Sequence, residues 1–142
     1  MSAETKALAR RFLEEVFNGG NLDLVEELVA PGFVNHDAAM PEPLVGIEAA
    51  KATISGYRAA FPDLRITIED QIGEGEYVTS RWSARGTHEG ELMGIAATGK
   101  QATVTGITID RIANGRFVES WTNWDTLGLL QQLGVAPALA TA

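Results

Sequence analysis

Four side chains near the end of the chain could carry out acid–base chemistry. Glu119, Trp121, Asn123 and Asp125 follow one another at intervals of two residues, and residues at this spacing in a β-strand project from the same face. Asp125 would then lie beside the indole ring of Trp121. An apolar neighbour disfavours the charged form of a carboxyl and raises its pKa toward the range that proton transfer near neutral pH requires. The spacing therefore predicts a site with Asp125 as the acid–base residue and Trp121 as its apolar wall.

Asp125 has a second possible role, because it directly precedes a Leu-rich segment at 126–133. Asp is a favoured N-cap residue, and such a cap contributes about 1 kcal/mol to the stability of a helix. One carboxylate oxygen can cap a helix while the other faces a cavity. The sequence therefore leaves both roles open.

The chain contains two histidines, His36 and His88. Either imidazole could stabilise a developing oxyanion or exchange a proton near neutral pH. His88 is expected at the end of a strand. It could act in the reaction there, or it could be a partly exposed loop histidine with no role in the reaction. His36 alternates with Asn35 and Asp37, so either His36 or the other two can face inward.

Other kinds of site find little support. The chain has no cysteine, which excludes disulfides, thiolate nucleophiles and cysteine-based metal sites. Its two histidines have no acidic pair at the spacing of metal ligands, and there is no nucleophile elbow, P-loop or dinucleotide-binding glycine pattern. We therefore expect a reaction that uses neither a metal ion nor a cofactor.

The elements that must position these residues follow from hydrophobic spacing and from glycine and proline punctuation. Helices are predicted at about 2–18, 22–29, 47–61 and 126–133, a short strand at 33–37, and longer strands at 64–72, 77–86, 103–112 and 117–124. The longer strands follow one another as antiparallel neighbours, and Asn114-Gly115 is a hairpin turn. This order predicts an α+β fold with helices on one face of a curved sheet, forming a cone.

Length and charge place further limits on the protein. We expect a single domain over residues 1–142, with a frayed tail at about 136–142. The net charge of −8 disfavours nucleic acid and anionic lipid as partners. No segment approaches the ~20 apolar residues of a membrane span, and the N-terminus lacks the pattern of a signal peptide. The sequence predicts a soluble, cytoplasmic protein.

Several segments together resemble the SnoaL-like polyketide cyclase (ester cyclase) family. They are FVNHD at 33–37, FPDL at 61–64, GTHEG at 86–90, TGK at 98–100, and ESW at 119–121 with DTLGLLQQLG at 125–134. The resemblance covers nearly the whole chain up to Gly134. This family belongs to the cone-shaped α+β superfamily that also includes nuclear transport factor 2, ketosteroid isomerase and limonene epoxide hydrolase.

The resemblance implies an activity and a set of site residues. The implied reaction is intramolecular aldol ring closure of a polyketide ester or a similar small apolar carbonyl compound, with one Asp as acid–base residue and no cofactor. Asp125 matches that Asp by position, and Asn35, His36 and His88 fall in blocks that line the family's pocket. Asn35, Asn123 and His88 would stabilise the oxyanion.

Two other enzymatic reactions and a non-catalytic role remain open. An isomerase would need a tyrosine donor in the pocket, and the chain has Tyr57 and Tyr77. An epoxide hydrolase would need a relay such as Asp110, Arg111 and Asp125, which requires Asp110 to face inward. The non-catalytic alternative is a module that binds a small molecule or serves for dimerisation.

Both faces of the last predicted strand carry large apolar side chains. Phe117 and Trp121 occupy one parity, and Val118 and Trp124 occupy the other. Only one of these faces can cover the interior of a cone, and an exposed apolar patch of this size favours association. We therefore expect a homodimer or homotetramer.

Overall fold

The computed structural model describes residues 2–137 of the chain. The predicted tail at 136–142 lies largely outside these residues. The helices are α1 (Ser2–Arg11), η1 (Phe12–Asn18, a π-helical continuation of α1), α2 (Asp23–Leu28), α3 (Ile47–Ala60) and α4 (Thr126–Gln132). The strands are β1 (Val29–Asp37), β2 (Leu44–Val45), β3 (Arg65–Glu74), β4 (Tyr77–Thr87), β5 (Gln101–Ala113) and β6 (Arg116–Trp124).

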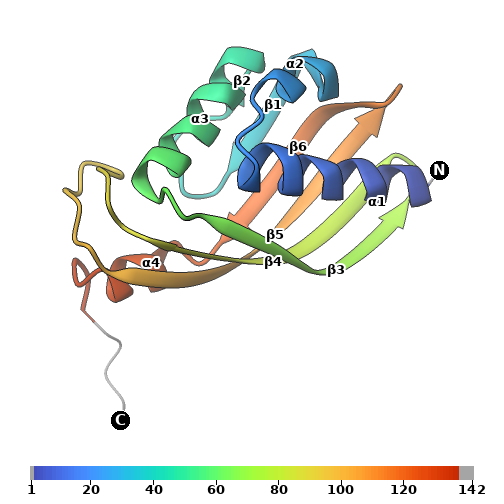
Figure 1. Ribbon diagram of the computed structural model, residues 1–142. Helices are drawn as coiled ribbons and strands as arrows, with labels where there is room; N and C mark the ends of the chain where they lie inside the picture. The colour runs from blue at the N-terminus through green and yellow to red at the C-terminus, as the bar shows by residue number, and fades with distance from the viewer. Residues whose placement is uncertain (1, 138–142) are drawn as a thin grey trace.

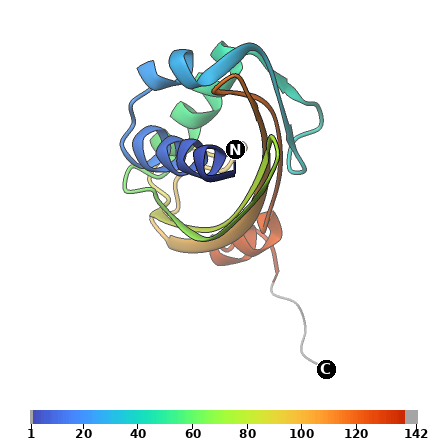
Figure 2. The ribbon, with the colours of Figure 1, turned by 90° about the vertical axis from the view of Figure 1, so that its right-hand side faces the viewer.

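The strands form one six-stranded sheet in the order β2-β1-β6-β5-β4-β3. The four longer strands are antiparallel neighbours, as predicted, whereas β1 runs parallel to β6. Helices α1, α2 and α3 lie on the concave side of the sheet (Figure 1). Seen end-on, the sheet curves around α1 (Figure 2). The predicted α+β cone is confirmed. No helix among residues 2–137 is long and apolar enough to cross a membrane.

The first strand begins earlier than predicted. Val29 was expected to end a helix, but it has extended backbone angles (φ −110°, ψ 131°) and begins β1. The strand includes Pro31, which cannot donate a hydrogen bond to a neighbouring strand. Proline is tolerated at irregularities in a ladder, and the pairing of β1 with β6 shifts register between Val29 and Val34.

Local chemistry explains two boundaries that the sequence predicts correctly. Helix α3 ends at Ala60, and Phe61 adopts φ −129° and ψ 83°, because a residue before proline is excluded from the helical region. The turn between β5 and β6 places Asn114 and Gly115 at φ 54° and 74°. Two successive positive φ angles are required in the type I′ turn that Asn-Gly favours.

Strand β6 contains one extra residue relative to β5. Arg111 pairs with Glu119 and Ile112 pairs with Phe117, so Val118 is inserted between them as a bulge. A bulge interrupts the alternation of faces along a strand. Phe117 and Ser120 consequently both line the interior of the cone, although their spacing of three would place them on opposite faces of a regular strand.

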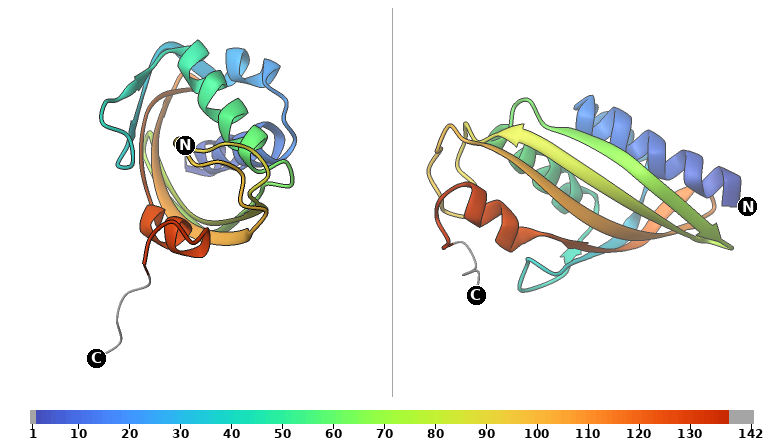
Figure 3. Two further views of the ribbon diagram at one scale, coloured as in Figure 1. Left: turned by 90° about the vertical axis from the view of Figure 1, so that its left-hand side faces the viewer. Right: turned by 90° about the horizontal axis from the view of Figure 1, so that it is seen from below.

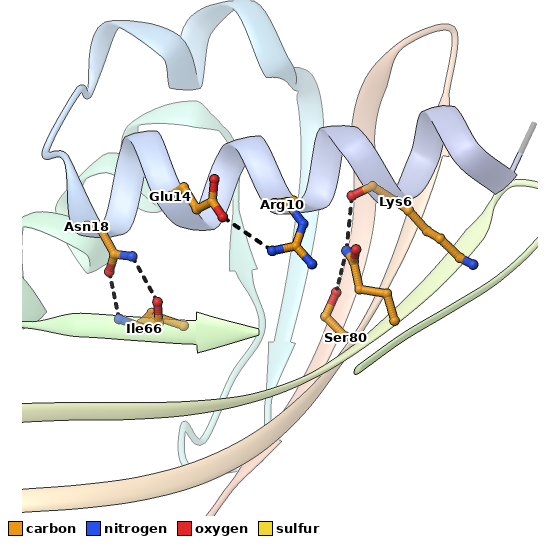
Figure 4. A network of polar contacts seen from close by, with 7 residues as sticks. Lys6, Arg10, Glu14, Asn18, Ile66 and Ser80 are labelled. Atoms are coloured by element: carbon orange, nitrogen blue, oxygen red, sulfur yellow. Dashed lines mark hydrogen bonds and ion pairs between the residues drawn. The ribbon is translucent and has the colours of Figure 1, made fainter. Parts of the chain in front are cut away.

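Hydrogen bonds attach the N-terminal helical segment to the sheet (Figure 4). Asn18 accepts from the backbone N–H of Ile66 at 2.6 Å and donates to the carbonyl of the same residue at 2.8 Å. Nearer the start of α1, the Gln71 amide donates to the Lys6 carbonyl at 3.0 Å and to the Ser80 hydroxyl at 3.3 Å. These bonds hold α1 and η1 against β3 and β4.

Replacing Asn18 with alanine should therefore weaken the attachment of η1 to the sheet. The change leaves two backbone groups of Ile66 without their partner, and a lost partner of this kind costs about 1–3 kcal/mol. Urea unfolding of Asn18→Ala should show that loss. The control is Glu14→Ala, which removes an exposed ion pair with Arg10 and should cost at most about 1 kcal/mol. Equal losses in both variants would contradict the role given to Asn18.

Candidate active site

The interior of the cone contains a cavity of about 190 Å³. It lies between α1, η1 and α3 on one side and the concave face of the sheet on the other. Figure 3 (left) shows these elements arranged around the interior from the end opposite to that of Figure 2. Most of the wall is apolar and includes Phe12, Phe17, Phe33, Ile54 and Leu129. Such a cavity suits a largely apolar ligand.

Two rows of polar side chains cross the sheet side of the cavity. The Asp110 row consists of Asp110 on β5, its partner Ser120 on β6, and Asn35 on β1, which is the partner of Ser120 on the other side. All three residues line the cavity. Partners on adjacent strands lie side by side on the same face of a sheet. The row therefore places a carboxyl, a hydroxyl and an amide next to one another in an otherwise apolar wall.

The Asp37 row lies next to it, two residues further along each strand. It consists of Asp37, Thr122, Thr108 and Ser80, on β1, β6, β5 and β4 in turn. These four residues also line the cavity. The second row thus adds another carboxyl and three hydroxyl groups to the same wall.

Asp110 is the buried carboxyl of the cavity, with 8% of the residue exposed. Burial raises its pKa from 3.8 to about 6, and a hydrogen bond from the Ser120 hydroxyl at 2.5 Å partly opposes this rise. Removal from water disfavours the ionised form of a carboxyl. Asp110 can therefore both lose and regain a proton near neutral pH, as an acid–base residue must.

Asn35, at the other end of the Asp110 row, has an unsatisfied acceptor. Its Oδ1 atom is buried and has no hydrogen-bond partner among the described residues. An acceptor in this state costs about 1–3 kcal/mol. A hydroxyl or enol group on a ligand in the cavity would satisfy it.

Asp37 has a different set of contacts. The Trp124 indole N–H lies 3.2 Å and 3.4 Å from its two carboxylate oxygens, and the Ala39 backbone N–H donates to Oδ1 at 2.8 Å. Tyr57 also lines this part of the cavity, edge-on to Trp124 at 6.2 Å between ring centroids. Burial, together with the charge of Asp37, raises the pKa of Tyr57 to about 12. Tyr57 is therefore a neutral hydroxyl donor at physiological pH.

A third aromatic ring, that of Trp82, forms part of the cavity wall. Its indole N–H donates to the Thr108 hydroxyl at 3.0 Å, and that hydroxyl lies 3.2 Å from the hydroxyl of Thr122. A Cβ atom at Gly106 would come within 2.3 Å of the Trp82 ring. Glycine at this position therefore allows the ring to lie against β5.

Three of the predicted site residues lie outside the cavity. Asp125 and Asn123 are exposed, and Trp121 is half-buried on the convex face of the sheet. Asp125 accepts a hydrogen bond from the Gly128 backbone N–H at 2.9 Å and so caps α4, which confirms its capping role. The prediction that Trp121 and Asp125 share an interior cavity is wrong, because Trp121 lies on the face of β6 that points away from the interior and Asp125 lies beyond the end of β6, at the start of α4.

The two histidines also lie outside the residues that line the cavity. His36 is on the convex face, where it stacks on Trp121 with centroids 5.5 Å apart and contacts Glu119 at 2.7 Å. His88 is fully buried, and its Nδ1 atom accepts from the Thr98 backbone N–H at 3.2 Å. This bond holds the loop between β4 and β5. Asn35 is the predicted substrate-binding residue that does line the cavity. The sequence left open whether His36 or the pair Asn35 and Asp37 faces inward, and the structure shows that Asn35 and Asp37 do.

Sequence reasoning missed the role of Asp110 as an interior carboxyl. The alternation along β5 places Thr108 and Asp110 inside and Ile107 and Ile109 outside, the reverse of the usual pattern. The epoxide hydrolase relay also fails to assemble, because Arg111 pairs with Glu76 at 3.2 Å and Asp125 is outside. Among residues 2–137, no group of three His, Asp or Glu side chains gathers as metal ligands do.

Comparison with known proteins gives consistent matches. A family model described as SnoaL-like polyketide cyclase matches residues 7–133. The chain is 32% identical over 130 residues to the aklanonic acid methyl ester cyclase DnrD of Streptomyces peucetius, covering 89% of this chain and 88% of that protein.

Solved structures agree with these matches. IdmH from Streptomyces antibioticus is 34% identical and superposes with a TM-score of 0.79 over 92% of this chain and 99% of its own. A SnoaL-like protein from Jannaschia sp. CCS1 superposes with a TM-score of 0.88 over 96% of this chain and 95% of its own. At 23% identity, this second likeness concerns the fold alone.

The burial of Asp110 should be visible in the pH dependence of stability. Well below the unfolded pKa of 3.8, this carboxyl is protonated in both the folded and the unfolded chain. Above pH 4 the unfolded form ionises first, since its pKa is lower, so folding stability falls as pH rises toward the folded value of about 6. Asp110→Asn should remove a loss on the order of 2 kcal/mol between pH 4 and 7. Urea unfolding at several pH values measures it. The control is Asp70→Asn at an exposed position; a wild-type slope in Asp110→Asn would argue against a raised pKa.

Proposed function

Because the chain belongs to the SnoaL-like polyketide cyclase family, we propose that it is an enzyme that closes a ring in a small carbonyl compound by acid–base catalysis. The observation that supports this most directly is Asp110, a buried carboxyl with a raised pKa in the wall of an apolar cavity. A carboxyl of this kind suits proton transfer near neutral pH. The proposal thus moves the acid–base role from Asp125 to Asp110.

The proposed reaction is an intramolecular aldol addition. A proton leaves the carbon next to one carbonyl group, and the resulting enolate attacks a second carbonyl carbon of the same molecule. The new alkoxide then takes up a proton. Asp110 takes part in this proton exchange, while the Asn35 amide and the Tyr57 hydroxyl are donors for the developing oxyanion. A donor of this kind contributes about 2.7–4 kcal/mol to catalysis when it is fixed in a dry site.

The cavity also limits the kind of substrate. Its walls are mainly apolar, and its polar wall carries Asp37 and Asp110, so a neutral ester suits the interior better than a free carboxylate does. A cavity of about 150 Å³ can hold benzene, and the volume here is about 190 Å³. This volume suits small substrates, so the activity test should use open-chain and one-ring 1,5-diketone methyl esters. Aklanonic acid methyl ester, the compound in the name of the relative DnrD, should be tested beside them.

An isomerase shares the first proton transfer of this scheme. Tyr57 lines the cavity as a neutral donor, which is the residue type that this alternative requires. The two reactions differ in their products, because ring closure joins two carbons whereas an isomerase moves a double bond. Analysis of the product by NMR distinguishes them.

The activity test compares two carboxyl-to-amide changes. Asp110→Asn removes the titratable group of the cavity and should lower the rate of ring closure by about 100-fold or more. Asp125→Asn is the matched control, because asparagine still caps a helix and position 125 lies outside the cavity; its rate should stay near that of wild type. Near-ultraviolet circular dichroism checks that both variants are folded. Full activity in Asp110→Asn, or a large loss in Asp125→Asn, would refute this assignment.

We also propose that two copies of the chain associate through the convex face of the sheet. Ile72, Tyr77, Ile107 and Ile109 are exposed there, with Ile72 at 71%. Trp121 lies among them, in contact with Tyr77 and His36. An apolar surface of this extent is unusual for a monomer, and the same face on a second copy would cover it symmetrically.

A charge in the middle of this face should separate the two copies. Light scattering after size exclusion should show a dimer or a larger oligomer for wild type and a monomer for Ile109→Lys. Leu127→Lys is the control, since Leu127 is equally apolar and 49% exposed on α4. A monomeric wild-type protein at micromolar concentration would contradict the proposed association.

A further inference from the structure

We propose that Asp37 is a second proton-transfer residue of the cavity, and that it acts as the base while Asp110 acts as the acid. This inference rests on the proposed function and assigns its two proton transfers to two different carboxyls. It starts from the observation that both carboxyls line the same cavity. A reaction with one acid–base residue would need only one of them.

The sheet register places the two carboxyls at different points of the cavity wall. Asp110 is on β5 and Asp37 is on β1, with β6 between them, and they belong to adjacent rows. Two strand spacings and a step of two residues separate their backbones by about 12 Å. Both side chains point into the concave side, where a curved sheet brings them closer together. They can therefore reach two different atoms of one substrate.

The contacts of the two carboxyls suit them to opposite roles. Burial favours the neutral form of Asp110, and the hydrogen bond from the Ser120 hydroxyl only partly opposes this. Asp37 accepts N–H groups from Trp124 and Ala39, as an ionised carboxylate does. These contacts assign the acid role to Asp110 and the base role to Asp37.

The titratable groups near Asp37 lie on two sides of it. Tyr57 and Asp110 line the cavity with Asp37, and His36 and Glu42 border a second hollow that also includes Asp37. Arg85 also lines the cavity, but on β4 it is five residues beyond Ser80, the residue in the Asp37 row, which corresponds to about 17 Å along the strand. No lysine lines the cavity.

The proton transfers balance over one turnover. The Asp37 carboxylate takes a proton from the carbon beside the donor carbonyl, and the electron pair of that C–H bond forms the enolate. The enolate carbon bonds to the second carbonyl carbon, whose π electrons move to oxygen, and this oxygen takes the proton of Asp110. Asp37 then returns its proton to solvent and Asp110 regains one. The product is an isomer of the substrate, and no oxidant or reductant is needed.

The first transfer can be measured alone. The probe is 4-phenyl-2-butanone in D2O, because base-catalysed exchange of the protons beside its carbonyl requires no ring closure. Deuterium incorporation is followed by NMR. We expect wild type to accelerate it, Asp37→Asn to lower the enzymatic rate by about 100-fold, and Asp110→Asn to retain more exchange than Asp37→Asn, since its amide can still donate to the carbonyl oxygen. The control Asp70→Asn should exchange as wild type does.

A second variant keeps the test informative if Asp37→Asn does not fold. Trp124→Phe keeps an aromatic ring and removes the N–H that Asp37 accepts. Loss of that donor leaves one hydrogen bond fewer to hold the Asp37 carboxylate in place. The exchange rate should therefore fall by about tenfold, while an unchanged rate would count against Asp37 as the base.

A titration of the carboxyl carbons by NMR separates failure of this inference from failure of the proposed function. At pH 5 we expect Asp110 to be mostly protonated, because its pKa is about 6, and an Asp110 that is fully ionised at that pH would overturn its role as the acid. If wild type neither exchanges the ketone nor closes any ring, the proposed function fails and the inference fails with it. If wild type exchanges and Asp37→Asn exchanges equally fast, the inference alone is overturned.

Discussion

The inserted residue Val118 in β6 determines which side chains form the site. Phe117 faces the interior on one side of the bulge, and Ser120, Thr122 and Trp124 face it on the other. In a regular strand with the same residues and Phe117 inside, the alternation of faces would turn Trp121 and Asn123 inward and Ser120 outward. The buried hydrogen bond to Asp110, the pairing with Asn35 and the indole contact with Asp37 all depend on this shift. A single irregularity in one ladder thus sets the chemistry of the cavity.

The polar wall of the cavity carries a cost in stability. Burial of Asp110 and an unpartnered acceptor on Asn35 are both unfavourable for folding. Sites that bind or react often keep such groups, because a ligand or a transferred proton can satisfy them. The surrounding apolar packing offsets the cost: one cluster lies under the first three helices and another joins α4 to the end of α3.

The cavity persists because the helices are attached to the sheet by directed bonds as well as by apolar contact. Asn18 and Gln71 connect the first helical segment to β3 and β4, and His88 holds the loop between β4 and β5. Trp82 is fixed by its bond to Thr108 and lies against Gly106. Rings and helices that are held in this way cannot easily move inward to fill the space.

The sequence alone determined the α+β class, the order of the longer strands, the end of α3 before Pro62 and the hairpin at Asn114-Gly115, because these depend on local spacing and backbone sterics. It also indicated the family, the inward position of Asn35 as one of two options, and the capping role of Asp125. It could not decide which face of β5 and β6 is interior. Ile107, Ile109 and Trp121 are apolar but lie on the convex face, whereas Thr108, Asp110 and Thr122 line the cavity. Hydrophobic alternation points the wrong way here, and only the bulge and the curvature of the assembled sheet show which carboxyls share the interior.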